Sequence, residues 1–201
     1  MTTKDLFRCI GNLSDGMIEE AADIKRKPRW LPIAALAACA VAWKFGISGE
    51  TAAAALAEFH GAGRRLEYKG SFHGADVYDD YAHHPNELHA LLQAVRLMHY
   101  RRVICAFQPH TYSRTKALFQ SFVDELRTAD QVVLADIYAA REQNTVGVSS
   151  QELAAEIPGA VYCPSLQGVT DYLRENAQPG DIILTVGAGD IYKAGEALFT
   201  E

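Results

Sequence analysis

The sequence lacks the features that mark several classes of protein. Its four cysteines are far apart and form no C-x-x-C pair, which argues against a disulfide framework or a cysteine-rich zinc site. Acidic residues outnumber basic ones, 25 to 19, and the net charge of −6 argues against a nucleic-acid-binding surface. The G-x-S-x-G elbow of serine hydrolases is absent. We therefore expect a cytoplasmic protein with reduced thiols that does not bind nucleic acid.

Long apolar runs are also scarce. One uncharged segment, Trp30–Trp43, follows a basic cluster at 25–29 and therefore has the positive flank of a membrane anchor. Its 14 residues fall short of the roughly 20 that span a bilayer, and its alanines suit packing against another helix. We favour a buried helix in a water-soluble protein, and a membrane tether through residues 25–43 is the alternative.

The chain divides into three parts by its pattern. Residues 1–32 have apolar positions typical of one or two short helices and end in the basic, proline-containing cluster. Residues 33–62 predict two alanine-rich helices, at 33–45 and 49–59, followed by a glycine-rich hinge. Residues 63–201 form the third part, in which strand and helix patterns alternate.

The third part predicts an α/β fold. Short apolar runs that alternate with longer helical stretches are typical of a mostly parallel, Rossmann-like sheet with helices on both faces. The first two strands form a hairpin around His73-Gly74, because such a turn favours glycine. The expected strands are 66–72, 75–78, 103–107, 131–135, 160–163 and 181–186, and the expected helices are 87–99, 112–126, 149–156, 165–176 and 191–199.

The densest chemistry lies in the segment Asp79-Asp80-Tyr81-Ala82-His83-His84-Pro85. It follows an apolar run and precedes an amphipathic helix whose first turn Pro85 suits. The segment is therefore expected at the carboxyl end of a strand, where open α/β sheets bind ligands. For an isolated pair, His83 and His84 would more often be capping or packing residues. The neighbouring acidic residues and Tyr81 favour a site.

A second polar segment, Gln108-Pro-His-Thr-Tyr-Ser-Arg114, follows the next strand. A guanidinium grips a carboxylate through two parallel hydrogen bonds, so Arg114 is the leading candidate for binding an acid group there. An exposed, solvated charge is the alternative reading of Arg114. We expect Arg114 and His83 to meet in space and hold the carboxylate of a small zwitterion.

Two other loops carry weaker signals. Gly187-Ala-Gly-Asp190 opens the last helix with glycines that would let a ligand approach the backbone, although Tyr192 stands where a dinucleotide fingerprint has glycine. The segment 136–142 is either part of the site or a plain loop with an ion pair. A zinc site made by His83, His84 and His110 is disfavoured, because adjacent histidines rarely bind one ion and no further ligand has suitable spacing. No metal site is expected.

These segments, together with Gly63-Arg-Arg-Leu-Glu67, resemble in order the signatures of the C-terminal domain of the Mur ligase family, in its L-alanine-adding branch. The resemblance runs from about residue 33 to the end. A tripeptide-recycling relative has a similar acidic-histidine segment but lacks the Gln-Pro-His-x-Tyr-x-Arg pattern. The resemblance implies an ATP-dependent ligase of peptidoglycan synthesis, which joins UDP-N-acetylmuramate to L-alanine with Mg²⁺.

The resemblance also implies roles for particular residues. Asp80 and Arg65 would contact the ribose or adenosine side of ATP. L-alanine would be held by Tyr81, His83 and Arg114, and His110 would support that pocket. Position 111 is Thr where many relatives have Arg, which puts a contact from that position in doubt.

The chain departs from the family in what it lacks. The UDP-sugar-binding domain and the Gly-rich Lys-Ser/Thr loop that cradles phosphates have no counterpart, and residues 33–62 resemble only the last two helices of the central ATPase domain. We therefore expect no catalytic residue and no Mg²⁺ ligand in this chain, and no acyl phosphate formation by it alone, as in a truncated or rearranged gene product. Residues 1–32 are foreign to the family. The alternative is a non-catalytic binding or assembly module.

Overall fold

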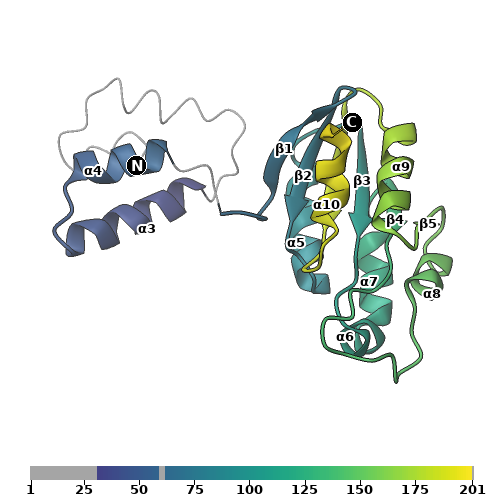
Figure 1. The fold of residues 1–201 in the computed structure, drawn as a ribbon. Helices are drawn as coiled ribbons and strands as arrows, with labels where there is room; N and C mark the ends of the chain where they lie inside the picture. The colour runs from purple at the N-terminus through teal and green to yellow at the C-terminus, as the bar shows by residue number, and fades with distance from the viewer. Residues whose placement is uncertain (1–30, 59–61, 201) are drawn as a thin grey trace. The chain divides into compact units, whose positions relative to one another are not determined.

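The computed structural model describes residues 31–58 and 62–200, which belong to two compact units divided between positions 61 and 62 (Figure 1). The helices expected within residues 1–30, the basic cluster at 25–29 and the centre of the glycine-rich hinge lie outside the described residues. Each unit is considered by itself below.

Unit 1 contains two helices, α3 (Leu31–Lys44) and α4 (Gly49–Ala57). The turn between them uses Gly46 at a φ of +77°, which a residue without a side chain adopts at little cost. Ser48 then caps α4, since its hydroxyl accepts a hydrogen bond from the Thr51 N–H at 3.2 Å. Both expected helices are therefore confirmed, but the expectation that the first is buried is not met among the described residues, where Val41 is 57% and Trp43 79% exposed. Among the described residues, no helix is long and apolar enough to cross a membrane.

Unit 2 is built on a six-stranded sheet of order β1-β2-β6-β3-β4-β5. Only β1 is antiparallel, paired with β2, and the other neighbours are parallel. The mostly parallel sheet and the hairpin at His73-Gly74 are thus confirmed. The strands are β1 (Glu67–Phe72), β2 (Ala75–Asp80), β3 (Arg102–Phe107), β4 (Gln131–Leu134), β5 (Val161–Tyr162) and β6 (Asp181–Val186).

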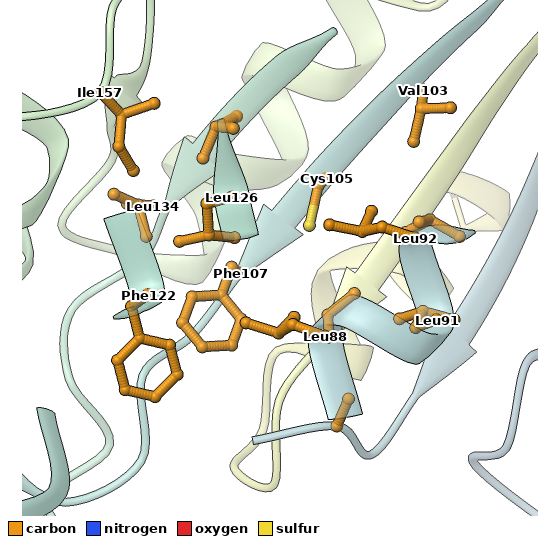
Figure 2. Close-up of a cluster of buried hydrophobic side chains, with 14 of the residues drawn as sticks. Leu88, Leu91, Leu92, Val103, Cys105, Phe107, Phe122, Leu126, Leu134 and Ile157 are labelled. Atoms are coloured by element: carbon orange, nitrogen blue, oxygen red, sulfur yellow. The ribbon is translucent and has the colours of Figure 1, made fainter. Parts of the chain in front are cut away.

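Helices cover both faces of this sheet, as Figure 1 shows. One face packs against α5 (Pro85–Arg96), α7 (Phe119–Leu126) and α8 (Ser150–Ala155), and the other against α9 (Leu166–Asn176) and α10 (Tyr192–Glu196). Apolar residues of α5 recur at helical spacing and are buried, so this helix is fixed by its apolar face. Figure 2 shows the first of the two cores, in which Leu88, Leu92, Phe107, Phe122 and Leu126 are fully or almost fully buried.

Several expected elements have different limits. The strand expected at 75–78 continues to Asp80, so the acidic pair lies within its end, and the helix expected at 87–99 is Pro85–Arg96. The single helix expected over 112–126 is two helices, α6 (Tyr112–Ala117) and α7, because Leu118 leaves the helical conformation at φ −113° and ψ 19°. No glycine or proline marks that break, so the sequence gives no sign of it. The strand expected at 160–163 is only Val161–Tyr162, and the last helix ends as the 3-10 turn Ala197–Phe199.

Candidate functional site at the carboxyl edge of the sheet

The three polar segments following β2, β3 and β6 meet at one edge of the sheet. Asp80 pairs with Val186, and Val186 pairs with Phe107, so these strands end at the same level. We call this edge, where the parallel strands end, the carboxyl edge. It has the placement expected for a ligand site in an open α/β fold.

The two acidic residues that end β2 are buried and hold the fold together. Asp79 accepts hydrogen bonds from Arg64 Nε at 2.7 Å and from Thr185 Oγ1 at 2.8 Å. Asp80 accepts one bond on each oxygen, from the N–H groups of Leu66 at 2.7 Å and Ala82 at 2.8 Å. Burial raises the pKa of Asp80. Both carboxylates therefore fix the backbone at the start of the site, and a contact between Asp80 and a ribose stays a prediction.

The two arginines at the start of unit 2 have different surroundings. Arg65, predicted to contact ATP, has an exposed side chain, and its charge acts on the carboxylates of Asp80 and Glu87. Arg64, to which we gave no role, is half-buried and forms an ion pair with Asp79. No sequence signal distinguishes Arg64 from Arg65, because its partner Asp79 lies 15 residues away in the chain.

His83 and His84 have separate tasks. His84 is the N-cap of α5, where its Nδ1 accepts a hydrogen bond from the Asn86 N–H at 3.3 Å, so the capping interpretation is confirmed for His84. His83 Nδ1 lies 3.0 Å from the carbonyl oxygen of Tyr81 and 3.4 Å from Glu87 Oε2. Although burial raises the pKa of Glu87, the His83 N–H and the His83 ring lower it overall, so Glu87 is a carboxylate that orients the first turn.

His110 lies between His83 and Arg114. The ring centroids of His83 and His110 are 6.0 Å apart, and Arg114 Nη1 is 3.5 Å from His110 Nδ1. No ion pair between described residues includes Arg114, although its charge contributes to lowering the pKa of Glu142. Burial, with the charges of Arg114 and His83, lowers the pKa of His110. The structure thus brings His83, His110 and Arg114 to one place, with His110 neutral near pH 7.

The residue that follows His110 has an unusual backbone. Thr111 has φ +68° and ψ 141°, a conformation that β-branched residues rarely adopt. Its carbonyl oxygen accepts hydrogen bonds from the Thr115 N–H at 3.2 Å and the Thr115 hydroxyl at 2.7 Å, while its N–H donates to the Tyr138 carbonyl oxygen at 2.9 Å. These bonds hold a strained loop beside the candidate site, as is common at functional sites.

Tyr138, in the segment 136–142 that was considered for the site, contacts the β3 loop. Its ring stacks on His110 with centroids 5.5 Å apart, and its N–H donates to the Pro109 carbonyl oxygen at 2.8 Å. The 136–142 segment is therefore tied to the β3 loop. Glu142, considered for an ion pair in this segment, instead accepts hydrogen bonds from the hydroxyl and N–H of Ser113, which lower the pKa of Glu142.

The glycines of the third loop are required by the protein's own packing. A side chain added at Gly189 would collide with Gln108 Oε1 at 2.3 Å and the Tyr138 ring at 2.7 Å, and one at Gly187 would meet the Gln108 carbonyl oxygen at 2.7 Å. The glycines therefore make room for Gln108 and Tyr138, and the approach of a ligand to this backbone stays a prediction. Gln108 Oε1 accepts bonds from the N–H groups of Asp190 and Ile191, so it occupies the start of the last helix.

No metal-binding cluster is evident in unit 2 or in α3 and α4. Within residues 31–58 and 62–200, no three side chains of His, Cys, Asp or Glu are placed to hold an ion. His84 is committed to its helix, which leaves His83 and His110 as a pair.

Comparison with known proteins identifies the family. Residues 64–189 match the family model described as Mur ligase, glutamate ligase domain. The chain is 45% identical over 171 residues to UDP-N-acetylmuramate–L-alanine ligase of Caldanaerobacter subterraneus and 48% identical over 167 residues to that of Lachnospira eligens. These matches cover 83% and 81% of this chain but 37% and 36% of the relatives, so the chain spans about a third of their length.

A solved structure gives the same result. The crystal structure of UDP-N-acetylmuramate-alanine ligase from Thermotoga maritima is 25% identical with a TM-score of 0.64, covering 82% of this chain and 35% of that one. The family model covers more than half of the chain, and its boundaries enclose Arg64, the histidines, Arg114 and the glycine loop. The chain therefore belongs to the Mur ligase family, through the domain that carries this carboxyl edge.

Proposed function

We propose that this chain is the amino-acid-binding portion of an ATP-dependent UDP-N-acetylmuramate–L-alanine ligase. The observation that carries the proposal is the convergence of His83, His110 and Arg114, contributed by two loops, where Arg114 enters no ion pair among the described residues. The relatives' names supply the substrate class. The carboxylate of L-alanine is the group whose charge and shape suit this edge.

Each side chain has a defined task in this proposal. Arg114 donates to the carboxylate oxygens of L-alanine, and His83 faces the same group. His110, neutral near pH 7, accepts from Arg114 and keeps the guanidinium directed outward. Tyr81, 37% exposed, forms the adjoining wall at 5.4 Å from the His83 ring. This binding mode leaves the amine of L-alanine free. The amine can then attack the carboxyl carbon of UDP-N-acetylmuramate, once ATP has converted that carboxylate to an acyl phosphate, and phosphate leaves.

The fit to ATP differs between the two residues assigned to it. Arg65 is exposed, so its guanidinium can reach the ribose or adenosine side of ATP, the contact expected of it. Asp80 is 8% exposed, and both of its oxygens are already bonded to backbone N–H groups, so its contribution is to place the Arg65 segment. Mg²⁺ in the complete enzyme would have its ligands elsewhere, because the described residues offer no cluster for it.

Unit 1 is proposed to be the end of the central ATPase domain. The relatives match 81–83% of the chain, more than unit 2 alone supplies, so the likeness extends into α4 and the end of α3. In these helices Trp43 and Phe45 are each 79% exposed, as expected for apolar side chains that a larger domain covers.

The test is an NMR titration of the ¹⁵N-labelled chain with L-alanine. The expected result is a saturable shift of amide signals at the two loops, 81–84 and 110–114, at millimolar concentrations. L-alanine methyl ester, which keeps the amine but lacks the carboxylate charge, serves as the matched ligand control and is expected to cause no shift. Equal shifts with the ester, or none with L-alanine, would contradict the proposal.

A further inference from the structure

Arg64 connects the segments that form the carboxyl edge. Its Nε donates to Asp79 Oδ2 at 2.7 Å, its Nη2 to the Gly187 carbonyl oxygen at 2.7 Å and its Nη1 to the Gly189 carbonyl oxygen at 3.1 Å. One guanidinium therefore ties the end of β2 to both glycines of the loop after β6. Every nitrogen of the planar group is used, which a lysine ammonium on a different stem cannot reproduce.

Two tyrosine rings lie close to the same guanidinium. Its central carbon lies 5.0 Å from the ring centroid of Tyr81 and 4.7 Å from that of Tyr192. Cations over aromatic faces are attracted by the ring quadrupole, more strongly when partly removed from water. Tyr81, the proposed wall of the amino-acid site, is thus held on one side by Arg64 and meets the edge of His83 on the other.

The backbone keeps Arg64 in this position. The Arg64 carbonyl oxygen accepts a hydrogen bond from the Tyr81 N–H at 2.9 Å, and the Arg64 N–H donates to Glu67 Oε2 at 2.7 Å. Arg64 and Leu66 both have positive φ, +56° and +45°, which side-chain-bearing residues seldom adopt. This conformation is maintained by the surrounding bonds, because without them the backbone would relax.

We propose that Arg64 is a positioning residue for amino-acid binding. It holds Tyr81 and, through Gly187 and Gly189, the loop against which Tyr138 packs, and the Tyr138 ring in turn stacks on His110. The inference rests on the function proposed above. Each of the three guanidinium nitrogens of Arg64 already donates a hydrogen bond inside the protein. Arg64 therefore acts on the ligand through the Tyr81 ring that it holds, and not by direct contact.

The chain offers a matched control at the opposite edge. Arg102 also pairs with a fully buried carboxylate, Asp181, and also donates to a backbone carbonyl oxygen, that of Asn176. The side chains of Arg64 and Arg102 are 24% and 29% exposed. Substituting each by lysine removes a guanidinium that bridges a buried carboxylate and a backbone carbonyl. Among the described residues, only Arg64 of the two also has tyrosine rings beside it.

The experiment compares Arg64→Lys, Arg102→Lys and the unaltered chain. The position of Tyr81 is read from its ring signals in ¹³C-tyrosine NMR spectra, assigned with Tyr81→Phe, and L-alanine affinity from the amide titration. Arg64→Lys is expected to move the Tyr81 ring signals and to weaken L-alanine binding about tenfold. Arg102→Lys is expected to lower thermal stability about as much as Arg64→Lys does, and to leave both the Tyr81 ring signals and the L-alanine affinity unchanged.

Each outcome decides the question. Unmoved Tyr81 signals and unchanged affinity in a folded Arg64→Lys chain would overturn the inference, and so would equal site changes in both variants. If the unaltered chain does not bind L-alanine, the proposed function fails, while the ring signals still decide whether Arg64 positions Tyr81. Should Arg64→Lys not fold, Tyr192→Leu is used instead, because it removes one of the two rings beside the Arg64 guanidinium and keeps the three hydrogen bonds of Arg64. It is then expected to move the Tyr81 signals, and unmoved signals would overturn the inference.

Discussion

Both edges of the sheet contain a buried aspartate paired with arginine, but they differ in the arginines that remain unpaired. At the amino edge, where the parallel strands begin, Arg101 and Arg102 both pair with the buried Asp181. At the carboxyl edge, Arg64 pairs with the buried Asp79 in the same way. Beyond that pair, however, the carboxyl edge carries Arg65 and Arg114, which enter no ion pair among the described residues. Paired charges therefore explain stability at both edges, and the surplus cations, of which Arg114 lies beside the histidines, indicate binding.

The largest expected effect removes the carboxylate of the amino edge. Asp181→Ala leaves Arg101 and Arg102 without their shared partner, and breaking such a buried pair costs about 3 kcal/mol of unfolding free energy. Denaturant unfolding measures this loss. Asp171→Ala, at an exposed position on α9, is the control and should change stability little. An unchanged midpoint for Asp181→Ala would contradict a structural role for this edge.

The next effect concerns binding. Arg114→Leu removes the cation beside His110 and replaces it with an apolar side chain. The affinity for L-alanine is therefore expected to fall about thirtyfold, while the free energy of unfolding changes by less than about 0.5 kcal/mol. The amide titration and denaturant unfolding are run on the same sample. Lys116→Leu, an exposed cation on the same helix, is the matched control and should bind normally. Equal losses in both variants would show that general charge, and not this side chain, attracts the ligand.

A smaller effect tests strain at the site. Glycine adopts positive φ without steric cost, so Thr111→Gly removes the strain of this residue, while the greater freedom of glycine in the unfolded chain offsets part of the gain. The expected net result is an increase of about 1 kcal/mol in the free energy of unfolding. Thr145→Gly lies in an exposed loop without this strain and should be neutral or destabilising. A destabilised Thr111→Gly chain would show that the threonine is not strained.

The smallest effect is a dependence of stability on pH. Because Arg114 and His83 join burial in lowering the pKa of His110, the folded protein resists the proton that the unfolded chain accepts near pH 6.5. The contribution of His110 is therefore complete above about pH 6.5 and is lost as pH falls through the lowered value. Thermal unfolding between pH 5 and 7.5 should show a weaker slope for His110→Gln than for the unaltered chain. Identical slopes would exclude this titration.

Much of the fold could be predicted from the sequence, because it depends on local patterns. Alternating apolar strands and amphipathic helices specify a parallel sheet, and His73-Gly74 specifies the hairpin. The break at Leu118 could not be predicted, since it depends on how α6 and α7 pack and on no breaking residue.

The parts of the candidate site formed by residues that are close in sequence could be predicted. The parts formed by residues far apart in sequence could not. His83 and Arg114 stand in dense polar segments after strands, and strand order brings such segments together. Arg64 and Tyr138 have ordinary sequence surroundings, and their importance arises only from contacts across the sheet. The packing role of the glycines was not predicted, because a sequence does not show that a side chain such as Gln108 occupies the space beside them.

The central claim is that His83 and Arg114 share one carboxylate. A crystal structure of this chain with L-alanine tests it most directly. The account predicts the ligand carboxylate within hydrogen-bonding distance of Arg114 Nη atoms and facing the His83 ring, with the methyl group toward Tyr81. L-alanine bound elsewhere on the chain, or a carboxylate turned away from Arg114, would contradict the claim.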